Sequence, residues 1–325
     1  MRPRAPSAPA NDAWCLTAAL TKQASGRALS YLMEASAAQA YSSSTRRMAK
    51  IKTPPVALRE PELEDFLRSR SDFAFEMRAL AALRLLGFQC QHAATYLDPL
   101  TEKIRAFDIR AHRRSDFSVL SLAVECKQLS DVAPLLLHRT PREASESHHS
   151  VLVRLVDSTG SSPYTRSVSP SETYPPHLPV ARQPDQPTMR DDGSWSSSDA
   201  ATYERWMQAV NGARDLVEAS ATMNLGSRSV FAALPMLIVP DGTLWIVDYD
   251  KNGARTGKPL RVDATSLYLG HEWTSVATGG TLKHALSHLE VCTISGLPHR
   301  VQELSGVDGP LARAAELLGP LRDYL

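Results

Sequence analysis

Apolar residues recur at two different spacings along this chain, and the spacings predict its helices and strands. Phe73, Leu80 and Leu83 follow one another at helical intervals until Gly87, a residue that commonly ends helices. We therefore expect a helix over 72–86. Further along, a second stripe predicts a helix over 200–220, with an apolar face made of Tyr203, Trp206, Val210, Ala213 and Val217.

Shorter apolar runs with strand-like character lie between these two helices. They are bounded by the Asp98-Pro99 turn signal and by a polar stretch at 113–116, and they cover 88–94, 104–111 and 117–126. Their spacing predicts an antiparallel meander.

The rest of the chain is less regular. Residues 139–198 are rich in Ser, Pro, Thr, Arg and His, so we expect a polar insertion that forms a loop or is partly disordered. Beyond it, the pattern predicts strands at 231–239 and 244–249 that flank the turn signal Pro240-Asp241-Gly242 as a hairpin. Later expectations are a strand at 266–269 and helices at 281–289 and 309–319.

These elements suggest four segments. Residues 1–47 are Ala/Ser-rich and lack clear periodicity, which predicts an appended or disordered N-terminal segment. Residues 48–138 and 199–325 then hold the two halves of one core, separated by the insertion at 139–198, and the second half carries a C-terminal β/α extension.

Composition narrows the function classes. No stretch of about 18 apolar residues occurs, and the four cysteines form no Cys-x-x-Cys pair, so we expect a cytoplasmic protein without a membrane span, disulfide framework or zinc site. With 36 Lys and Arg against 35 Asp and Glu, the whole chain has no basic excess for nucleic acid. Nucleic-acid binding would use a local patch, and 103–114 is the candidate.

Two charged residues share one face of the strand at 117–126. Alternation places Leu120, Leu122, Val124 and Cys126 on one face, so Glu125 and Lys127 emerge together on the other. In the preceding strand, Asp108 stands between two apolar residues, where a charge is costly unless it serves a turn, a pair or a metal.

Asp108, Glu125 and Lys127 together suit the hydrolysis of a phosphodiester with magnesium. Mg²⁺ prefers oxygen ligands and keeps several waters, so two carboxylates and the backbone carbonyl of Cys126 suffice, with Mn²⁺ as a substitute. The competing interpretation is a structural ion pair on a sheet face. Glu76 projects from the apolar face of the helix at 72–86, which leaves open a role in the metal or water network or as a helix-dipole acid.

The residues Asp108, Glu125 and Lys127, with Glu76 before them, resemble the PD-(D/E)XK, or restriction-endonuclease-like, superfamily of nucleases. The resemblance covers roughly 61–135 and 199–250. It implies an α/β fold with a central mixed β-sheet flanked by helices, and catalysis by these four residues on DNA more than RNA. Here Phe107, not proline, precedes the acid. The alternative is a degenerate nuclease fold that only binds nucleic acid or protein.

Three further residues are candidates for contacts with nucleic acid. Lys103 and Arg105 flank the approach to Asp108 and offer charge to phosphates. Gln208 lies off the apolar stripe of the helix at 200–220, where some members of the superfamily carry a functional Gln. The target sequence and the oligomeric state, including a homodimer, stay open.

Overall fold

Strands dominate the structure, a computed structural model that describes residues 57–99, 101–115, 118–157, 160–169, 171, 173–197, 200–222, 228–277 and 280–305. In chain order the first elements are α2 (Glu60–Ser69), α3 (Asp72–Leu85), β1 (Gln89–Leu97), β2 (Ile104–Ser115), β3 (Ser118–Cys126), β4 (Leu135–Pro141) and the 3₁₀ turn η2 (Ala144–Glu146). They are followed by β5 (His149–Asp157), β6 (Gly160–Val168), β7 (Pro179–Asp185), β8 (Pro187–Met189), β9 (Trp195–Ser197) and α4 (Ala200–Thr222). The last are β10 (Arg228–Val239), β11 (Leu244–Asp248), β12 (Leu260–Arg261), β13 (Ala264–Ala277), β14 (Gly280–Thr293) and α5 (Leu297–Ser305).

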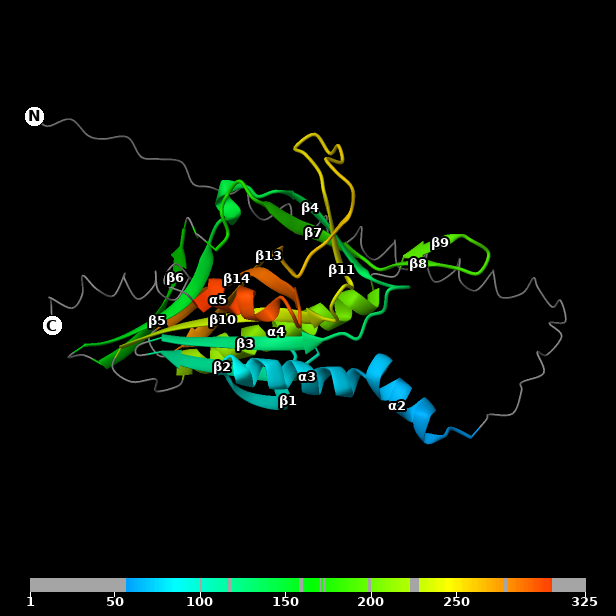
Figure 1. The fold of residues 1–325 in the computed structure, drawn as a ribbon. Helices are drawn as coiled ribbons and strands as arrows, with labels where there is room; N and C mark the ends of the chain where they lie inside the picture. Colours follow the sequence, from blue (N-terminus) through cyan, green and yellow to red (C-terminus); the bar gives the residue numbers. More distant parts are fainter. Residues whose placement is uncertain are drawn as a thin grey trace, which may run out of the picture. The chain divides into compact units, whose positions relative to one another are not determined.

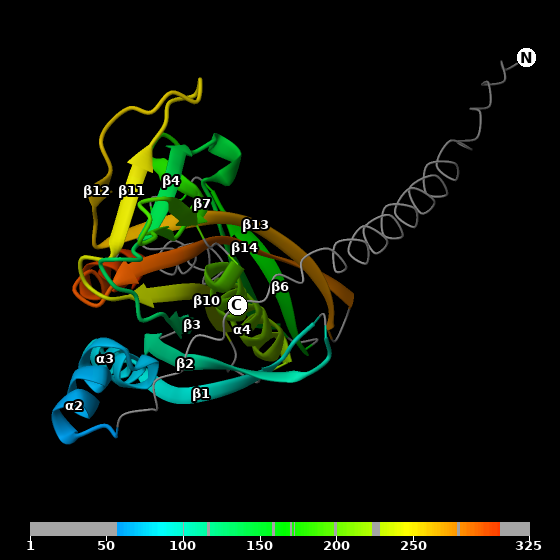
Figure 2. The ribbon, with the colours of Figure 1, turned by 90° about the vertical axis from the view of Figure 1, so that its right-hand side faces the viewer.

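Twelve of the described strands form one mixed sheet. Its main path runs β1-β2-β3-β10-β14-β13-β7-β4-β11-β12, with β5 and β6 attached beside β10. The order can be followed upward in Figure 2. β1, β2 and β3 are antiparallel neighbours, whereas β10 is parallel to both β3 and β14. The carboxyl ends of β3, β10 and β14 therefore lie at one edge of the sheet. The fold is mixed α/β, with one large mixed sheet and few helices among the described residues.

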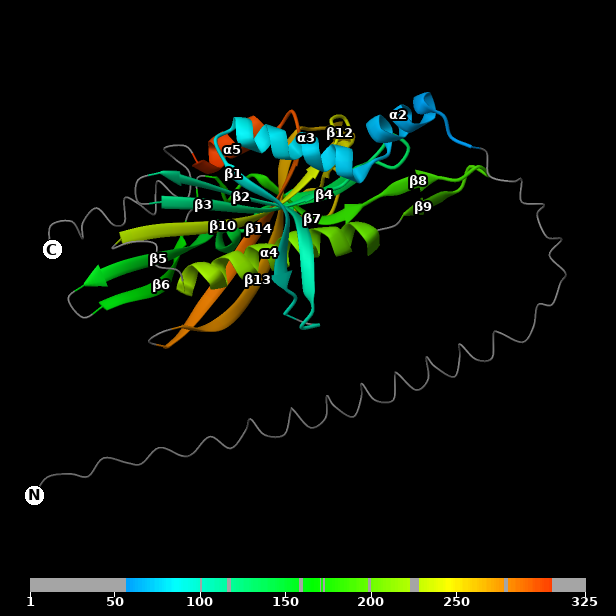
Figure 3. The same cartoon turned by 90° about the horizontal axis from the view of Figure 1, so that it is seen from below.

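Helices cover both faces of the central strands, with α3 and α5 on one face and α4 on the other (Figure 3). The side chains of β3 are almost all buried for this reason. α4 approaches β2 and β3 closely because Gly212 has no side chain: a Cβ there would lie 2.9 Å from Cδ1 of Phe107.

The predicted helices at 72–86 and 200–220 and the three strands after the first helix are confirmed. Ser71 caps α3 by accepting a hydrogen bond from the backbone N–H of Ala74, and Gly87 follows the helix with a φ of +82°. Each of the two predicted apolar stripes contains one residue that is exposed in the structure. Phe73 is 60% exposed while Phe75 is buried, and Tyr203 is exposed while the other four residues of its stripe are buried.

The polar loop expected over 139–198 is wrong for the described residues. This segment contains the end of β4 and all of β5, β6, β7, β8 and β9 (Figure 1). Half-buried and exposed positions are frequent in β7, β8 and β9, which suits Ser, Thr and Arg. β5 pairs with β6 and β8 with β9 as neighbours in sequence, but β5 also pairs with β10, which is distant in sequence. β7 likewise pairs with β13. Composition alone did not reveal such pairings.

Two predictions in the second half are also wrong. The helix expected at 281–289 is part of β14: its apolar residues have helical spacing, but pairing with β10 and β13 prevails. The strands at 231–239 and 244–249 exist but form no hairpin, because β10 already has β3 and β14 on its two edges and β11 pairs with β4 and β12. The expected strand at 266–269 lies within β13. The segment at 1–47 and the helix at 309–319 lie outside the described residues.

Candidate functional site

Asp108 lies where β2 separates from β3. The ladder between the two strands runs from Ser115 and Ser118 to Ile109 and Val124, and Asp108 is the next residue. Its Oδ2 accepts a hydrogen bond of 2.7 Å from the backbone N–H of Cys126. The Asp108 carboxylate thus accepts the hydrogen bond that a backbone carbonyl of β2 would otherwise accept from Cys126.

The same residue marks a change of face along β2. Phe107 is buried in the cluster around α4, whereas Ile109 is buried in the cluster around α3. Strict alternation would put both on one face, so the strand twists at Asp108. The carboxylate is half-buried at the end of the paired region.

Glu125 and Lys127 come from β3 and its end. Glu125 is fully buried on the face that α4 covers, since its register partner Leu237 packs with residues of α4. The Nζ of Lys127 donates a hydrogen bond of 3.0 Å to Oε1 of Gln186, and the Nε2 of Gln186 donates to the carbonyl of Ala133 at 3.2 Å. Gln186 therefore fixes the direction of the lysine side chain.

The carboxylates lie close enough to act on the same neighbour. Burial raises the pKa of the Cys126 thiol well above its usual value, and the charges of Asp108, Glu76 and Glu125 raise it further. Burial also raises the pKa of Tyr96, to which the charge of Glu125 contributes. Each of the three acids selected from the sequence thus lies within electrostatic range of Cys126, at the end of β3.

Glu76 reaches this region from α3, on the other face of the sheet from Glu125. Its Oε2 lies 2.8 Å from Nε2 of His92 on β1, and the ring of His92 meets Phe73 edge-on. Glu76 has a histidine partner that the sequence did not suggest. This contact orients its carboxylate whether or not it also takes part in a water network.

The donor set fits magnesium better than zinc. The described residues contain no group of three or more His, Cys, Asp and Glu side chains suited to hold a metal ion. Mg²⁺ does not need one, because two carboxylates, a carbonyl and several waters complete its shell. Asp108, Glu125 and the carbonyl of Cys126 supply this number at adjacent strands, while the Cys126 thiol is buried in the apolar cluster and is not a ligand.

The candidates for nucleic-acid contacts are more dispersed. Lys103 is exposed in the turn between β1 and β2. Arg105 forms an ion pair of 2.7 Å with Asp98, so its charge is already balanced. Gln208 is half-buried on α4, and within the described part of the chain no contact joins it to the carboxylates.

Sequence reasoning missed Gln186, His92 and Asn211. Asn211 is buried on α4, and its side chain lowers the pKa of the Tyr96 phenol against the larger effect of burial. The sequence did contain a signal for His92. It lies two residues beyond Cys90 and therefore on the same face of β1, the face that packs against α3. No such signal existed for Gln186, because it lies 59 positions from Lys127 in the segment expected to be a loop.

Comparison with known proteins assigns no role to these residues. No helix in the described part of the chain has the length and apolar character needed to cross a membrane. Searches against protein-family models, curated proteins and solved structures found no match.

Proposed function

We propose that this protein is a Mg²⁺-dependent nuclease of the restriction-endonuclease-like type that cleaves DNA in preference to RNA. One observation carries the proposal. Asp108 and Glu125 lie on adjacent antiparallel strands at the step where strand pairing stops, with Lys127 two residues beyond Glu125.

The arrangement of elements supports the same proposal. A helix, three antiparallel strands, a second helix and a strand parallel to the third follow one another as α3, β1, β2, β3, α4 and β10. This is the order that the resemblance to the superfamily implies. The acid falls on the second of these strands and Glu-x-Lys at the end of the third, as the resemblance also implies.

Each residue then has a distinct task. Asp108 and Glu125 would hold the metal together with the carbonyl of Cys126, and the backbone N–H of Cys126 keeps the Asp108 carboxylate in place. A bound Mg²⁺ makes water more acidic and stabilises negative charge on phosphate oxygens. Lys127, directed by Gln186, supplies a positive charge beside the reacting phosphate.

Cleavage assays test this proposal directly. Plasmid DNA, single-stranded DNA and RNA are incubated with the full chain in Mg²⁺, in Mn²⁺ and in EDTA. We expect cleavage of DNA in both metals and none in EDTA. Absence of metal-dependent cleavage on every substrate contradicts the proposal and favours a fold that only binds nucleic acid or a protein.

A further inference from the structure

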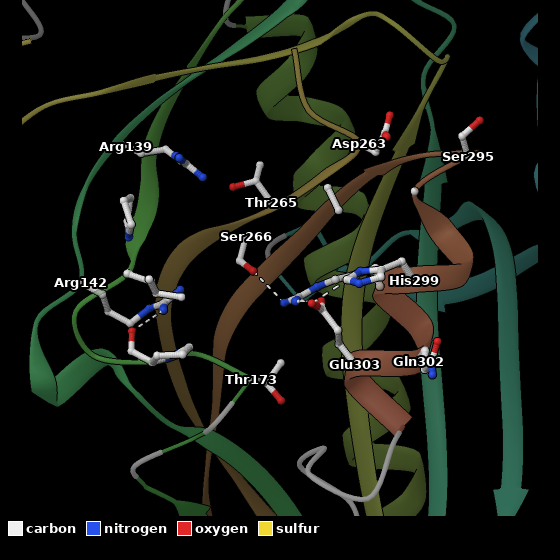
Figure 4. Close-up of a pocket in the computed structure, with 16 residues that line it drawn as sticks. Arg139, Arg142, Thr173, Asp263, Thr265, Ser266, Ser295, His299, Gln302 and Glu303 are labelled. Atoms are coloured by element: carbon white, nitrogen blue, oxygen red, sulfur yellow. Dashed lines mark hydrogen bonds and ion pairs between the residues drawn. The ribbon is translucent and has the colours of Figure 1, made fainter. Parts of the chain in front are cut away.

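A second polar site lies away from the carboxylates. A pocket of about 1020 Å³ opens between the end of β4, the start of β13 and α5 (Figure 4). Three arginines line it, Arg139, Arg142 and Arg300, together with Thr265 and two carboxylates, of which Glu303 pairs with Arg300 and Asp263 accepts from Thr293. The combination of guanidinium and hydroxyl donors suits an anion.

Two of the three arginines already have carboxylate partners. Arg139 forms a two-point ion pair with Asp248, with N···O distances of 2.7 and 2.9 Å. Arg300 donates to Glu290 at 2.6 Å and also contacts Glu303. Their positive charges are therefore balanced within the protein.

Arg142 differs from both. It is 7% exposed, its Nη1 donates to the carbonyl of Pro175 at 2.8 Å, and its guanidinium lies 5.3 Å from the centre of the Tyr174 ring. Within the described part of the chain no carboxylate accepts a hydrogen bond from it, and its buried Nε has no acceptor. Glu290 and Glu146 act on it only at longer range.

A buried guanidinium without a carboxylate contact is costly unless a ligand balances it. Burial lowers the pKa of Arg142, which is the expected sign of that cost. The Nε of Arg142 and the Oγ1 of Thr173 are both closed to solvent, so a ligand in the pocket can contact only the remaining N–H groups of Arg142.

The walls of the pocket are rigid. Tyr174 is fully buried, donates its hydroxyl to Glu290 and stacks on His288 with ring centres 3.6 Å apart. At the other wall, a Cβ on Gly296 would lie 2.1 Å from the carbonyl oxygen of Asp263, so only glycine allows α5 to begin so near β13. Arg142 itself is held by its hydrogen bond to Pro175 and its contact with the Tyr174 ring.

We infer that this pocket binds a phosphate group, with Arg142 as its principal donor. A guanidinium offers five N–H groups; one donates to Pro175 and that of Nε is closed to solvent, so a phosphate can accept from the others. The inference rests on the pocket itself and does not require the protein to be a nuclease.

The sheet suggests two sources for the phosphate. Cys126, Ile238, Cys292 and Ala264 are register partners across β3, β10, β14 and β13. Three steps of about 4.8 Å separate the ends of this row, which puts the backbone of Ala264, beside the pocket, about 14 Å from that of Cys126. A nucleic-acid strand can span that distance in about four nucleotides at about 3.4 Å each. A free nucleotide is the other source.

Binding in EDTA tests the inference independently of cleavage. Calorimetry and thermal melting of the full chain are carried out with inorganic phosphate, a nucleoside monophosphate and a 5′-phosphorylated oligonucleotide. We expect at least one probe to bind and to raise the melting temperature by mass action. We expect Arg142→Gln to weaken binding of that probe at least tenfold, and the matched variant Arg190→Gln, at an exposed position, to leave it unchanged.

Each outcome of this experiment either supports or overturns phosphate binding in the pocket. Similar affinity for the nucleotide and the oligonucleotide identifies a nucleotide site, and much tighter binding of the oligonucleotide identifies a strand site. Either identification also requires that Arg142→Gln weakens binding of the probe. If Arg142→Gln does not fold, Arg142→Lys serves instead. Unchanged affinity in the variants, or no binding by any probe, overturns the inference.

Discussion

Glu125 and Glu290 are both fully buried carboxylates on strands that flank β10, yet their surroundings differ. Their register partners on β10 are Leu237 and Met236, so the two side chains project to opposite faces of the sheet. Glu290 lies among positive and hydroxyl groups. Glu125 lies in a region where other carboxylates gather.

Glu290 is a structural ion. It accepts hydrogen bonds from Tyr174, Arg300 and Ser266, and the charge and lone pairs of the carboxylate are satisfied by side chains of the same protein. The charges of Glu125, Asp108 and Glu76 instead all act on Cys126, where they add to the effect of burial in raising the pKa of the thiol. The contrast separates an internal salt bridge from a candidate metal site.

The largest expected effect is on cleavage. Asp108→Asn removes a metal ligand while keeping its shape, so we expect a loss of at least about 100-fold in cleavage rate and weaker Mg²⁺ binding. Lys127→Ala should slow cleavage similarly but spare Mg²⁺ affinity. Plasmid nicking and Mg²⁺ titration measure both, with Lys258→Ala as an exposed control. Normal cleavage by Asp108→Asn would contradict the assignment.

Glu290→Gln should affect stability instead. It leaves the buried Arg300 without its main partner, and breaking such a pair costs about 3 to 5 kcal/mol. Urea unfolding should show this loss, whereas cleavage per folded molecule should be retained. A variant as stable as the wild type would show that Glu290 is not a structural ion.

Gln186→Ala should have a smaller effect that is specific to Lys127. Without the acceptor at 3.0 Å, the ammonium group samples more positions, and we expect about a tenfold loss of cleavage rate. Mg²⁺ affinity and stability should change little. Gln183→Ala, exposed on β7, is the matched control. If both variants cleave equally, Gln186 does not position the lysine.

The smallest effect concerns the packing of α4 on the strands of the site. In Gly212→Ala the new Cβ meets the buried ring of Phe107, and overpacking should exceed the gain in helix propensity of about 1 kcal/mol. We expect a net loss of about 1 kcal/mol in urea unfolding. Gly257→Ala, with open space around it, should be neutral.

Local features were more predictable than the sheet that holds them. Alternation in β3 is a local property, so the burial of Leu120, Leu122 and Val124 in one cluster follows from it, and the caps of α3 are local as well. β7 pairs with β4 and β13, and β14 pairs with β10 as well as with β13; no local pattern reports the pairings between strands distant in sequence. Gln186 was missed for the same reason.

Glu125→Gln tests the central claim most directly. We compare plasmid cleavage in Mg²⁺ by this variant, the wild type and Glu272→Gln, an exposed carboxylate on β13 that pairs with Lys283. The account predicts that the wild type and Glu272→Gln cleave alike, while Glu125→Gln loses at least about 100-fold in rate without loss of stability. Cleavage by Glu125→Gln at the wild-type rate would contradict the account.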